Sequence, residues 1–387
     1  MNKKGILILF SILIQISCFS QGNSEWDSVK LKKAEKYSQE IGTFSFILMT
    51  NGKVVSAWGD TTTPTNLQSA RKAISSTIYY TYINKGILDP EKTLAQLGID
   101  DYPNPLTKLQ KQAKVIHLLK CISGINHAAD AEIQQMRDER DQRLGSTPNI
   151  PGTKWAYNNW DINTLNTIFE QESQISEKQV FLNSIAYPIG MQDINENTVD
   201  FTKDTRMSVH PAIQYNLSAR DMAKFGQLCL NKGNWEGKQL VPKEYFEKIV
   251  TDYAKTGNSG WRSGHGYLWW VPCDSVANMD GIPEGTYYAS GAGSQRIIVI
   301  PKWNSVIIHK SFIKAEEGIK LFAIQSGYTE EYVMNNLELV VEEFIDFVYN
   351  KCKEPEYHEN EICIICKPVE ISDFYSLMKM VFDAKIK

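Results

Sequence analysis

The 387-residue chain has no excess of charge that would point to a polyanionic partner. It carries 41 Lys and Arg against 45 Asp and Glu, and its formal net charge is −4. Surfaces that bind nucleic acid or an anionic membrane usually show a basic excess, so composition supports neither partner. Internal repeats and low-complexity tracts are also absent, which argues against repeat architectures. With 42% hydrophobic residues, the chain can bury a large core, and its length predicts two closely joined domains.

Long hydrophobic runs are missing as well. The apolar run near the N-terminus, Ile6 to Ile14, is too short for a permanent bilayer anchor. Two lysines precede it and small polar residues follow it, which is the pattern of an export signal. We therefore predict a signal peptide over residues 1–22 and a mature protein that is periplasmic or secreted. Cys18 leaves a second interpretation open, in which a lipid on this residue attaches the protein to a membrane, although Gln15 stands where lipoprotein sites usually carry Leu.

Histidine and cysteine are scarce, with six and seven residues. The histidines show no metal-ligand spacing, and Cys121 and Cys229 lie in apolar helical surroundings that predict buried side chains. Three further cysteines cluster near the C-terminus, where Cys363 and Cys366 have the spacing of a redox pair or a zinc ribbon. Two interpretations stay open for this tail, a disulfide or a zinc site completed by His358. Its cysteines are Cys352, Cys363 and Cys366.

Strand patterns lie near both ends of the chain, with helical patterns between them. Residues 44–48 and 54–58 flank Asn51-Gly52, a pair that favours a tight hairpin turn. The apolar residues of 74–87 recur at helical spacing, and 330–349 is predicted as a helix that packs on the late strands. This order predicts an α+β fold in which a sheet domain carries a helical insertion. The late strand patterns cover 287–288, 296–300 and 305–309.

The same pattern predicts where the parts of the chain begin and end. Residues 25–90 and 220–350 form a discontinuous sheet domain, and 91–219 form an inserted helical domain. Residues 351–387 are a cysteine-bearing C-terminal tail. Within the insertion, 132–143 carries charges of both signs and is predicted to be a solvated helical face or a lid.

A candidate nucleophile stands at the head of the helix predicted over 74–87. A serine hydroxyl attacks carbonyls poorly unless a neighbouring base takes its proton. Ser69 and Lys72 are three residues apart, so on a helix they project from the same face. The spacing alone also fits a helix N-terminus capped by Ser69. The remaining motifs must decide between these interpretations.

Two more segments carry residues suited to acyl transfer. In Trp155-Ala-Tyr-Asn-Asn159, the phenol of Tyr157 can relay a proton if a neighbouring ammonium lowers its pKa, and the amide of Asn159 can hold a lysine and a substrate carbonyl. In Tyr288-Ala-Ser-Gly-Ala292, small residues allow close approach of a substrate backbone. Each segment alone would be an ordinary turn or edge strand.

The order of the three segments resembles that of the penicillin-recognising serine hydrolases. The similar branch contains class C β-lactamases, carboxylesterases, D-amino-acid peptidases and 6-aminohexanoate-oligomer hydrolases. The resemblance runs from about Ile41 to Tyr349 and implies their β-lactamase/transpeptidase-like fold, an α/β sandwich with an antiparallel sheet and an inserted all-α domain. Further similar stretches begin at Val115, Pro151, Tyr187, Leu217 and Gly266.

The resemblance implies a role for each matching residue. Ser69 would attack the substrate and become acylated, while Lys72 and Tyr157 would act as a coupled pair that moves the protons. Asn159 would orient Lys72 and the substrate. The backbone N–H groups of Ser69 and Ala292 would form the oxyanion hole. The family needs no metal and no organic cofactor for this chemistry.

One position departs from the family pattern. Relatives carry Lys or His ahead of the Ser/Thr-Gly pair, where it helps to bind a substrate carboxylate, whereas this chain has Ala289 before Ser290 and Gly291. Arg296 is a candidate replacement cation on the next strand, and His265 is a candidate for the rim of the pocket. Several aromatic residues are candidates for an apolar substrate pocket. They are Tyr267, Trp269, Trp270, Tyr287 and Tyr288.

The predicted function is that of an exported serine hydrolase that cleaves a small ester or amide through an acyl-enzyme on Ser69. Substrate binding is predicted to involve Ala289, Ser290, Gly291, Tyr267 and Trp269. A penicillin-binding sensor that does not turn over, a true β-lactamase and a D-amino-acid peptidase stay open as alternatives. The predicted partner is a small-molecule substrate, and the sequence gives no prediction of oligomeric state.

Overall fold

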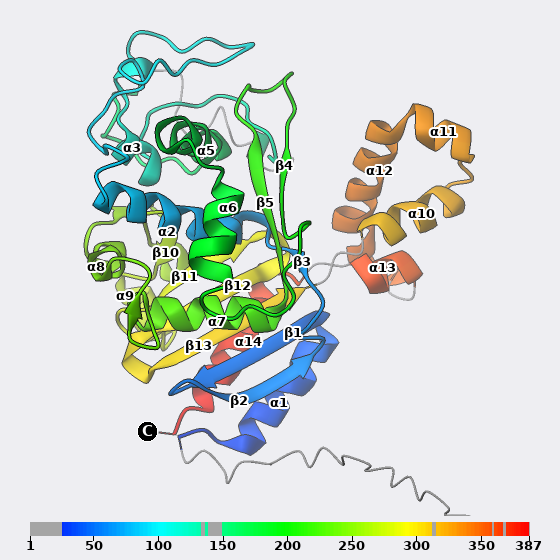
Figure 1. The fold of residues 1–387 in the computed structure, drawn as a ribbon. Helices are drawn as coiled ribbons and strands as arrows, with labels where there is room; N and C mark the ends of the chain where they lie inside the picture. Colours follow the sequence, from blue (N-terminus) through cyan, green and yellow to red (C-terminus); the bar gives the residue numbers. More distant parts are fainter. Residues whose placement is uncertain are drawn as a thin grey trace, which may run out of the picture.

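The computed structural model describes residues 25–132, 136–137, 149–311, 315–357, 360–366 and 369–386. Its centre is an antiparallel eight-stranded sheet with the order β2-β1-β13-β12-β11-β10-β9-β8 (Figure 1). The first and last strands along the chain, β1 and β13, pair next to each other in this sheet, so strands from the two ends of the chain share one sheet. The strands are β1 (Thr43–Thr50), β2 (Lys53–Gly59), β8 (Ala254–Lys255), β9 (Gly264–Gly266), β10 (Trp269–Val271), β11 (Tyr287–Gly291), β12 (Gln295–Ile300) and β13 (Ser305–Ser311).

The predicted N-terminal hairpin is confirmed. β1 and β2 are joined through Asn51 and Gly52, whose φ angles are 53° and 72°. Two successive positive φ angles define the tight turn that matches the twist of paired strands, and Asn-Gly adopts them with little strain. The local sequence therefore fixes the register of this hairpin.

Helices cover both faces of the sheet (Figure 1). One face carries α2 (Arg71–Asn84), α7 (Ala219–Leu230) and α8 (Lys243–Thr251), and the other carries α1 (Ser28–Glu40) and α14 (Ile371–Asp383). The alternation of strand side chains explains the two cores, because Ile297 and Val299 of β12 enter the first while Ile298 and Ile300 enter the second. Outside these layers lie the small hairpin β6 (Asn234–Trp235)–β7 (Lys238–Gln239) and α9 (Ser275–Met279).

A mainly helical region joins α2 to α7. A buried carboxyl group of Glu177 ties it together, because it accepts hydrogen bonds from Tyr79, Tyr215 (2.8 Å) and Asn166 (2.9 Å). Burial raises the pKa of this carboxyl group. Most of the predicted lid, 132–143, lies outside the described residues. The elements of the region are α3 (Val115–Leu119), α5 (Asn159–Ser173), α6 (Glu177–Val180), the π-helix Phe181–Ala186, β3 (Thr65–Asn66), β4 (Val199–Thr202) and β5 (Ala212–Leu217).

The helix predicted over 330–349 forms, but the prediction that it packs on the sheet is wrong. It is divided into α11 (Glu330–Asn335) and α12 (Leu337–Asn350), which join α10 (Ala315–Gln325) and α13 (Glu361–Cys366) in a helical module beside the main body (Figure 1). The module has its own small core, and α14 takes the expected place on the sheet. The module core contains Phe322, Val340, Phe344, Val348, Ile362 and Cys366.

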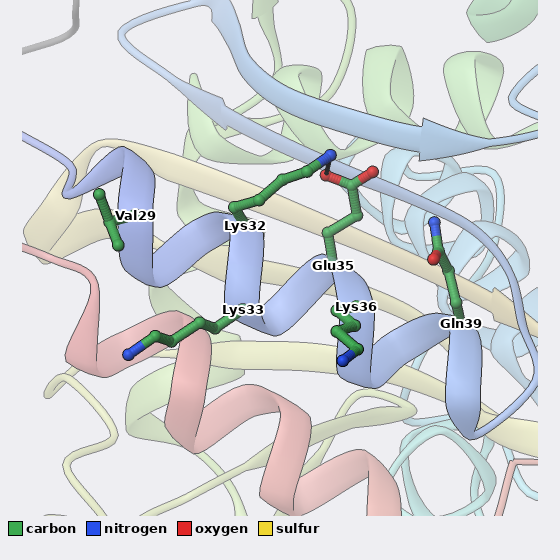
Figure 2. A pocket seen from close by; sticks show the side chains of 6 residues that line it. All are labelled: Val29, Lys32, Lys33, Glu35, Lys36 and Gln39. Carbon is green, nitrogen blue, oxygen red and sulfur yellow. Dashed lines mark hydrogen bonds and ion pairs between the residues drawn. The ribbon is translucent and has the colours of Figure 1, made fainter.

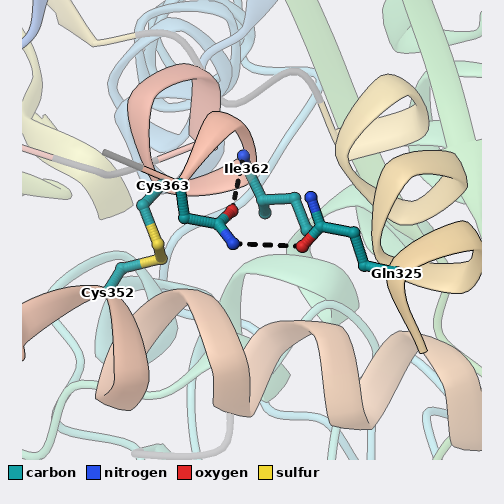
Figure 3. The surroundings of a disulfide bond; sticks show 5 residues. Gln325, Cys352, Ile362 and Cys363 are labelled. Atoms are coloured by element: carbon teal, nitrogen blue, oxygen red, sulfur yellow. Dashed lines mark hydrogen bonds between the residues drawn. A yellow bond between two sulfur atoms is a disulfide. The ribbon is translucent and has the colours of Figure 1, made fainter. Parts of the chain in front are cut away.

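A disulfide between Cys352 and Cys363 joins the end of α12 to α13 (Figure 3). Beside it, the Asn360 amide donates to Gln325 (3.0 Å) and accepts from the Ile362 backbone N–H (2.9 Å). A cysteine in a disulfide cannot supply the thiolate that zinc requires. The disulfide interpretation of the tail is therefore favoured, and His358 lies outside the described residues.

Loss of this disulfide is expected to destabilise the module rather than the sheet. The bond closes a loop with a sequence separation of 11, for which chain entropy predicts about 2 to 3 kcal/mol. We expect the double variant Cys352→Ser/Cys363→Ser to lose amide-exchange protection in α10–α13 while β11–β13 keep theirs. Equal loss in the sheet and the module would contradict this expectation. Hydrogen exchange with mass spectrometry checks it.

The predictions about export concern the first 22 residues, which lie outside the described residues. Within the described ranges, no helix combines the length and apolar character needed to cross a bilayer.

Candidate active site

Ser69 lies in a 3₁₀ turn, Gln68–Ala70, that runs directly into α2. The turn is held by two hydrogen bonds, from the Gln68 N–H to the Asn66 side chain (2.7 Å) and from the Ala70 N–H to the Leu67 carbonyl (3.1 Å). Gln68 adopts a φ of 52°, a conformation that is uncommon for a residue with a side chain. Strained backbone of this kind clusters at functional sites. It fixes the position of the half-buried Ser69 at the start of the helix.

Lys72 lies one helical turn after Ser69 and is 1% exposed. Its ammonium nitrogen is 3.2 Å from the Ser69 hydroxyl, 2.5 Å from the Tyr157 hydroxyl and 2.6 Å from the Asn159 carbonyl oxygen. The ring of Tyr157 also lies beneath it, at 4.1 Å. Four residues predicted from two separate segments are thus brought together, with Ser69, Tyr157 and Asn159 around the nitrogen of Lys72.

Asn159 is the first residue of α5 and is fully buried. Its amide nitrogen donates to the Ala131 carbonyl at 2.6 Å, which leaves the amide oxygen directed at Lys72. The preceding Asn158 caps the helix by accepting the backbone N–H of Asp161 at 2.7 Å. The helix start therefore orients Asn159, and Asn159 in turn orients the lysine.

The sequence tied a proton-relay role of Tyr157 to a pKa lowered by a neighbouring ammonium, and the structure does not meet that condition. Burial raises the pKa of this phenol to about 12, against smaller opposing effects of the Ser69 hydrogen bond and the Arg71 charge. Removal from water disfavours the phenolate more than nearby groups favour it. Tyr157 is therefore a neutral phenol at neutral pH, which suits a proton donor.

Asp161 is a buried carboxyl group behind the site. It accepts the Ser123 hydroxyl at 2.6 Å, and its second oxygen has no hydrogen-bond partner within the described ranges. Burial raises the pKa of Asp161 to about 7, although the charge of Lys72 opposes this shift. The titration of this carboxyl group is therefore moved close to neutral pH.

Replacing Asp161 with asparagine is expected to change how stability depends on pH. A carboxyl pKa raised in the folded state contributes stability that is present below about pH 4 and is lost as the pH rises through about 7. Asn keeps an acceptor for Ser123 and does not titrate. We expect the stability of Asp161→Asn relative to the wild type to rise by about 2 to 4 kcal/mol between pH 5 and pH 8. Urea unfolding of both proteins at the two pH values measures this stability difference. If the stability of the two proteins changed equally with pH, the expectation would be contradicted.

The end of β11 lies against the turn that carries Ser69. A Cβ atom built on Gly291 would stand 2.3 Å from the Leu67 carbonyl oxygen and 3.1 Å from the Ala70 nitrogen, so only glycine fits there. Ala292 follows at the start of the 3₁₀ turn Ala292–Ser294. The contact between Gly291 and Leu67 thus brings the backbone of Ala292 near that of Ser69.

One edge of β11 is available beside this contact. β10 pairs with β11 at Trp270 and Tyr288, whereas β12 pairs with every residue from Tyr287 to Gly291. Ala289 is buried and Ser290 is half-buried. Beyond Tyr288, the end of β11 therefore has a strand partner on its β12 side alone among the described strands.

Arg296 does not replace the cation that is missing at Ala289. Its guanidinium is buried and donates to the carbonyl oxygens of Gly291 (2.8 Å) and Gln295 (3.0 Å). It also lies over the ring of Phe374 in α14, at 4.9 Å. Burial lowers its pKa to about 10. Arg296 thus belongs to the core on the α14 side of the sheet.

The structure places Tyr267 and Trp269, two of the predicted substrate-binding residues, among buried side chains that have hydrogen-bond partners of their own. Tyr267 is 2% exposed and donates to Asp252 (2.9 Å), and Trp269 is fully buried and donates to Tyr245 (2.9 Å). Tyr287 and Tyr288 are equally buried and donate to the backbone carbonyls of Cys229 and Trp261. Trp270 of this aromatic set contacts Tyr157, with ring centroids 5.7 Å apart.

Other parts of the molecule offer less chemistry. Cys121 and Cys229 are buried as predicted, and His127 lies 3.5 Å from Asp101. The described residues contain no cluster of His, Cys, Asp and Glu that could hold a metal ion. A groove of about 400 Å³ runs along α1, where aliphatic stems of lysines form much of its wall (Figure 2). It shares no residue with the site around Lys72.

Comparison with known proteins agrees with this geometry. The model of the Beta-lactamase family matches residues 30–309, more than half of the chain. The chain belongs to this family. An uncharacterized protein of Alkalihalophilus pseudofirmus is 22% identical over 313 residues, which cover 74% of this chain and 89% of that protein.

Solved structures of other proteins share the fold. A Bacillus anthracis protein provisionally described as a 6-aminohexanoate-dimer hydrolase is 20% identical, with 83% of this chain and 82% of that chain covered and a TM-score of 0.54. An octameric penicillin-binding protein homologue from Pyrococcus abyssi is 18% identical, with coverage of 83% and 80% and a TM-score of 0.53. The predicted β-lactamase/transpeptidase-like fold is thereby confirmed, and it is the fold of a serine hydrolase family.

From the sequence, His265 was only a candidate for the rim of the pocket and Trp270 only a candidate for its apolar lining, and Arg262 was not predicted. Arg262 is exposed and lies over the Trp270 ring at 5.3 Å. No motif surrounds it, so the sequence carried no signal for its position. Its place is set by the 3₁₀ turn Gly260–Arg262 before β9.

Proposed function

We propose that this Beta-lactamase family member is an exported serine hydrolase that cleaves a small ester or amide through an acyl-enzyme at Ser69. The observation that carries the proposal is the position of the Lys72 nitrogen, within hydrogen-bonding distance of Ser69, Tyr157 and Asn159. A buried amine at this distance from a serine hydroxyl can activate it as a nucleophile.

In this mechanism, the Ser69 oxygen attacks the substrate carbonyl carbon while its proton passes to the coupled pair Lys72 and Tyr157, in which Lys72 starts as the neutral amine and becomes an ammonium. The tetrahedral intermediate then breaks the bond to the leaving group. Tyr157, a neutral phenol, gives a proton to that group, and the ammonium of Lys72 returns a proton to Tyr157. A water molecule then attacks the acyl carbon and gives one proton to the pair Lys72 and Tyr157. The pair passes a proton to the Ser69 oxygen as the acyl bond breaks, which releases the acid and regenerates Ser69.

The oxyanion of the tetrahedral intermediate is assigned to the backbone N–H groups of Ser69 and Ala292. The close approach of Gly291 to Leu67 and Ala70 supports this assignment, because it holds the two backbone segments together. Preorganised N–H donors of this kind contribute about 2.7 to 4 kcal/mol each to transition-state stabilisation in other hydrolases. The end of β11, with Ala289 and Ser290, would align the substrate.

The proposal is tested by covalent labelling of Ser69. A fluorophosphonate probe is expected to add one adduct to the mature protein, and Ser69→Ala is expected to add none in intact-mass measurements. Ser372→Ala, an exposed serine on α14, is the matched control and should label like the wild type. No adduct on the wild type, or an equal adduct on Ser69→Ala, would overturn the proposal. Labelling without steady-state ester hydrolysis would instead indicate the non-turnover sensor.

A further inference from the structure

Four aromatic rings form a cluster next to the proposed proton donor, which we call the aromatic box: Trp155, Tyr157, His265 and Trp270. His265 contacts Tyr157, Trp155 and Trp270, with ring centroids 5.6, 5.7 and 4.9 Å apart. Trp270 contacts Trp155 at 5.9 Å and Tyr157 at 5.7 Å. The register of β9 and β10 places His265 directly opposite Trp270.

The aromatic box contains polar atoms without partners. Both ring nitrogens of His265 and the indole nitrogen of Trp155 are buried and make no hydrogen bond within the described ranges. His265 is 0% exposed, and burial together with the charge of Lys72 lowers its pKa to about 3. The imidazole is therefore neutral and offers one N–H donor and one acceptor, while Trp155 offers a second donor. Buried polar groups in native proteins are nearly always paired, so three unpaired atoms in one cluster point to a missing polar ligand.

A cation stands at the same cluster. The exposed guanidinium of Arg262 lies over the Trp270 ring at 5.3 Å, and its charge opposes part of the rise that burial causes in the pKa of Tyr157. No carboxylate of the described residues lies within ion-pairing distance of it. A surface arginine held on an aromatic face without an acidic partner is suited to bind an anion.

We propose that the aromatic box and Arg262 form a subsite for a carboxylate on the leaving-group part of the substrate. In this subsite, the N–H groups of Trp155 and His265 donate hydrogen bonds to the leaving group, and Arg262 supplies the charge. The inference rests on the proposed function, because it assigns the leaving group to the side of Tyr157. It also supplies, from another part of the fold, the cation that Ala289 lacks.

The subsite narrows the substrate class. A leaving group that carries a carboxylate is an amino acid, an amino-acid oligomer or a hydroxy acid, released from an amide or an ester bond. Neutral short-chain esters of the same size would lack the charge-assisted contact with Arg262. They are therefore expected to be poorer substrates, even though the acylation chemistry at Ser69 is the same.

A pair of esters tests the preference. The wild type is expected to hydrolyse 3-acetoxybenzoate at least about 10-fold more efficiently, in kcat/KM, than its methyl ester, because a charged contact of this kind is worth about one order of magnitude. Arg262→Gln is expected to bring this ratio close to one, mainly through KM, and Arg262→Lys to restore part of it. Lys302→Gln is the control. It removes an exposed charge just after β12 and should keep the wild-type ratio of the two esters.

His265→Phe separates a binding role from a packing role. Phenylalanine fills the same space and removes two unpaired buried nitrogens, so the melting temperature is expected to rise or hold. The ratio for the two esters is nevertheless expected to fall several-fold. A variant that keeps the ratio would show that His265 only packs, and a wild type that does not distinguish the two esters would overturn the proposal.

A binding measurement keeps the inference separate from the proposed function. Benzoate is expected to shift the indole N–H resonance of Trp155, assigned with Trp155→Phe, whereas benzamide shifts it less. Arg262→Gln should weaken the benzoate effect about 10-fold. If Ser69 is never acylated but benzoate binds in this way, the proposed function fails and the anion site stands. If Ser69 labels normally and benzoate causes no shift, the subsite fails alone.

Discussion

Replacing Lys72 with alanine is expected to slow acylation of Ser69 by roughly 10³- to 10⁴-fold, the range lost when a positioned proton acceptor is removed from a hydrolase. This corresponds to about 4 to 5.5 kcal/mol of transition-state stabilisation. The reason lies in the geometry, because the lysine nitrogen is the atom at which the Ser69, Tyr157 and Asn159 side chains meet. Without it, the serine proton has no placed acceptor, and the neutral phenol of Tyr157 cannot serve as one.

The measurement is the burst rate with an activated aryl ester, followed by intact-mass detection of the acyl-enzyme. Lys33→Ala on α1 is the matched control, since it removes an exposed lysine with no contact to the site. Circular dichroism establishes that Lys72→Ala is folded. A folded Lys72→Ala protein that acylates at the wild-type rate would remove Lys72 from the mechanism.

The part of the site that lies in one continuous segment, the 3₁₀ turn and the start of α2, was predictable from sequence. Ser69 and Lys72 are three residues apart, and helical geometry alone places them on one face. Tyr157 and Asn159 were found through the order of the family motifs, because spacing along the chain says nothing about which loops meet. The raised pKa of Tyr157 could not be predicted for a related reason. Burial is a property of the assembled fold, and here it outweighs the neighbouring charges.

The sequence did not show which face of a strand or helix each side chain occupies, nor which element packs against it. Neighbouring strand residues point to opposite faces, so Trp269 enters the main core while Trp270 reaches Tyr157. A sequence of consecutive aromatics does not show which one faces the site. Likewise, helical spacing shows that α12 has an apolar face but not what covers it, and both α12 and α14 carry such a face. The aromatic box was beyond prediction because it combines a loop with two paired strands.

Gly291 is expected to be as sensitive as a catalytic residue although it carries no side chain. Its φ of −124° is open to any residue, so a substitution acts through contact and not through backbone strain. In Gly291→Ala, the new methyl group would meet the Leu67 carbonyl at 2.3 Å, a backbone atom that cannot rotate away. We expect the turn that carries Ser69 to shift away from Ala292. A displacement of about 1 Å reduces catalysis by roughly 10²-fold, and overpacking costs about 1 to 3 kcal/mol of stability.

Gly285→Ala provides the control for the effect of Gly291→Ala. Gly285 has a φ of +79° and open space around its Cβ position, so alanine there strains the backbone without touching the site. Both variants are expected to lose stability in urea unfolding, but only Gly291→Ala should lose kcat/KM for an aryl ester. Comparable losses of kcat/KM in both variants would mean that general destabilisation lowers activity. Unchanged kcat/KM in Gly291→Ala would mean that the contact between β11 and the Ser69 turn does not set the oxyanion geometry.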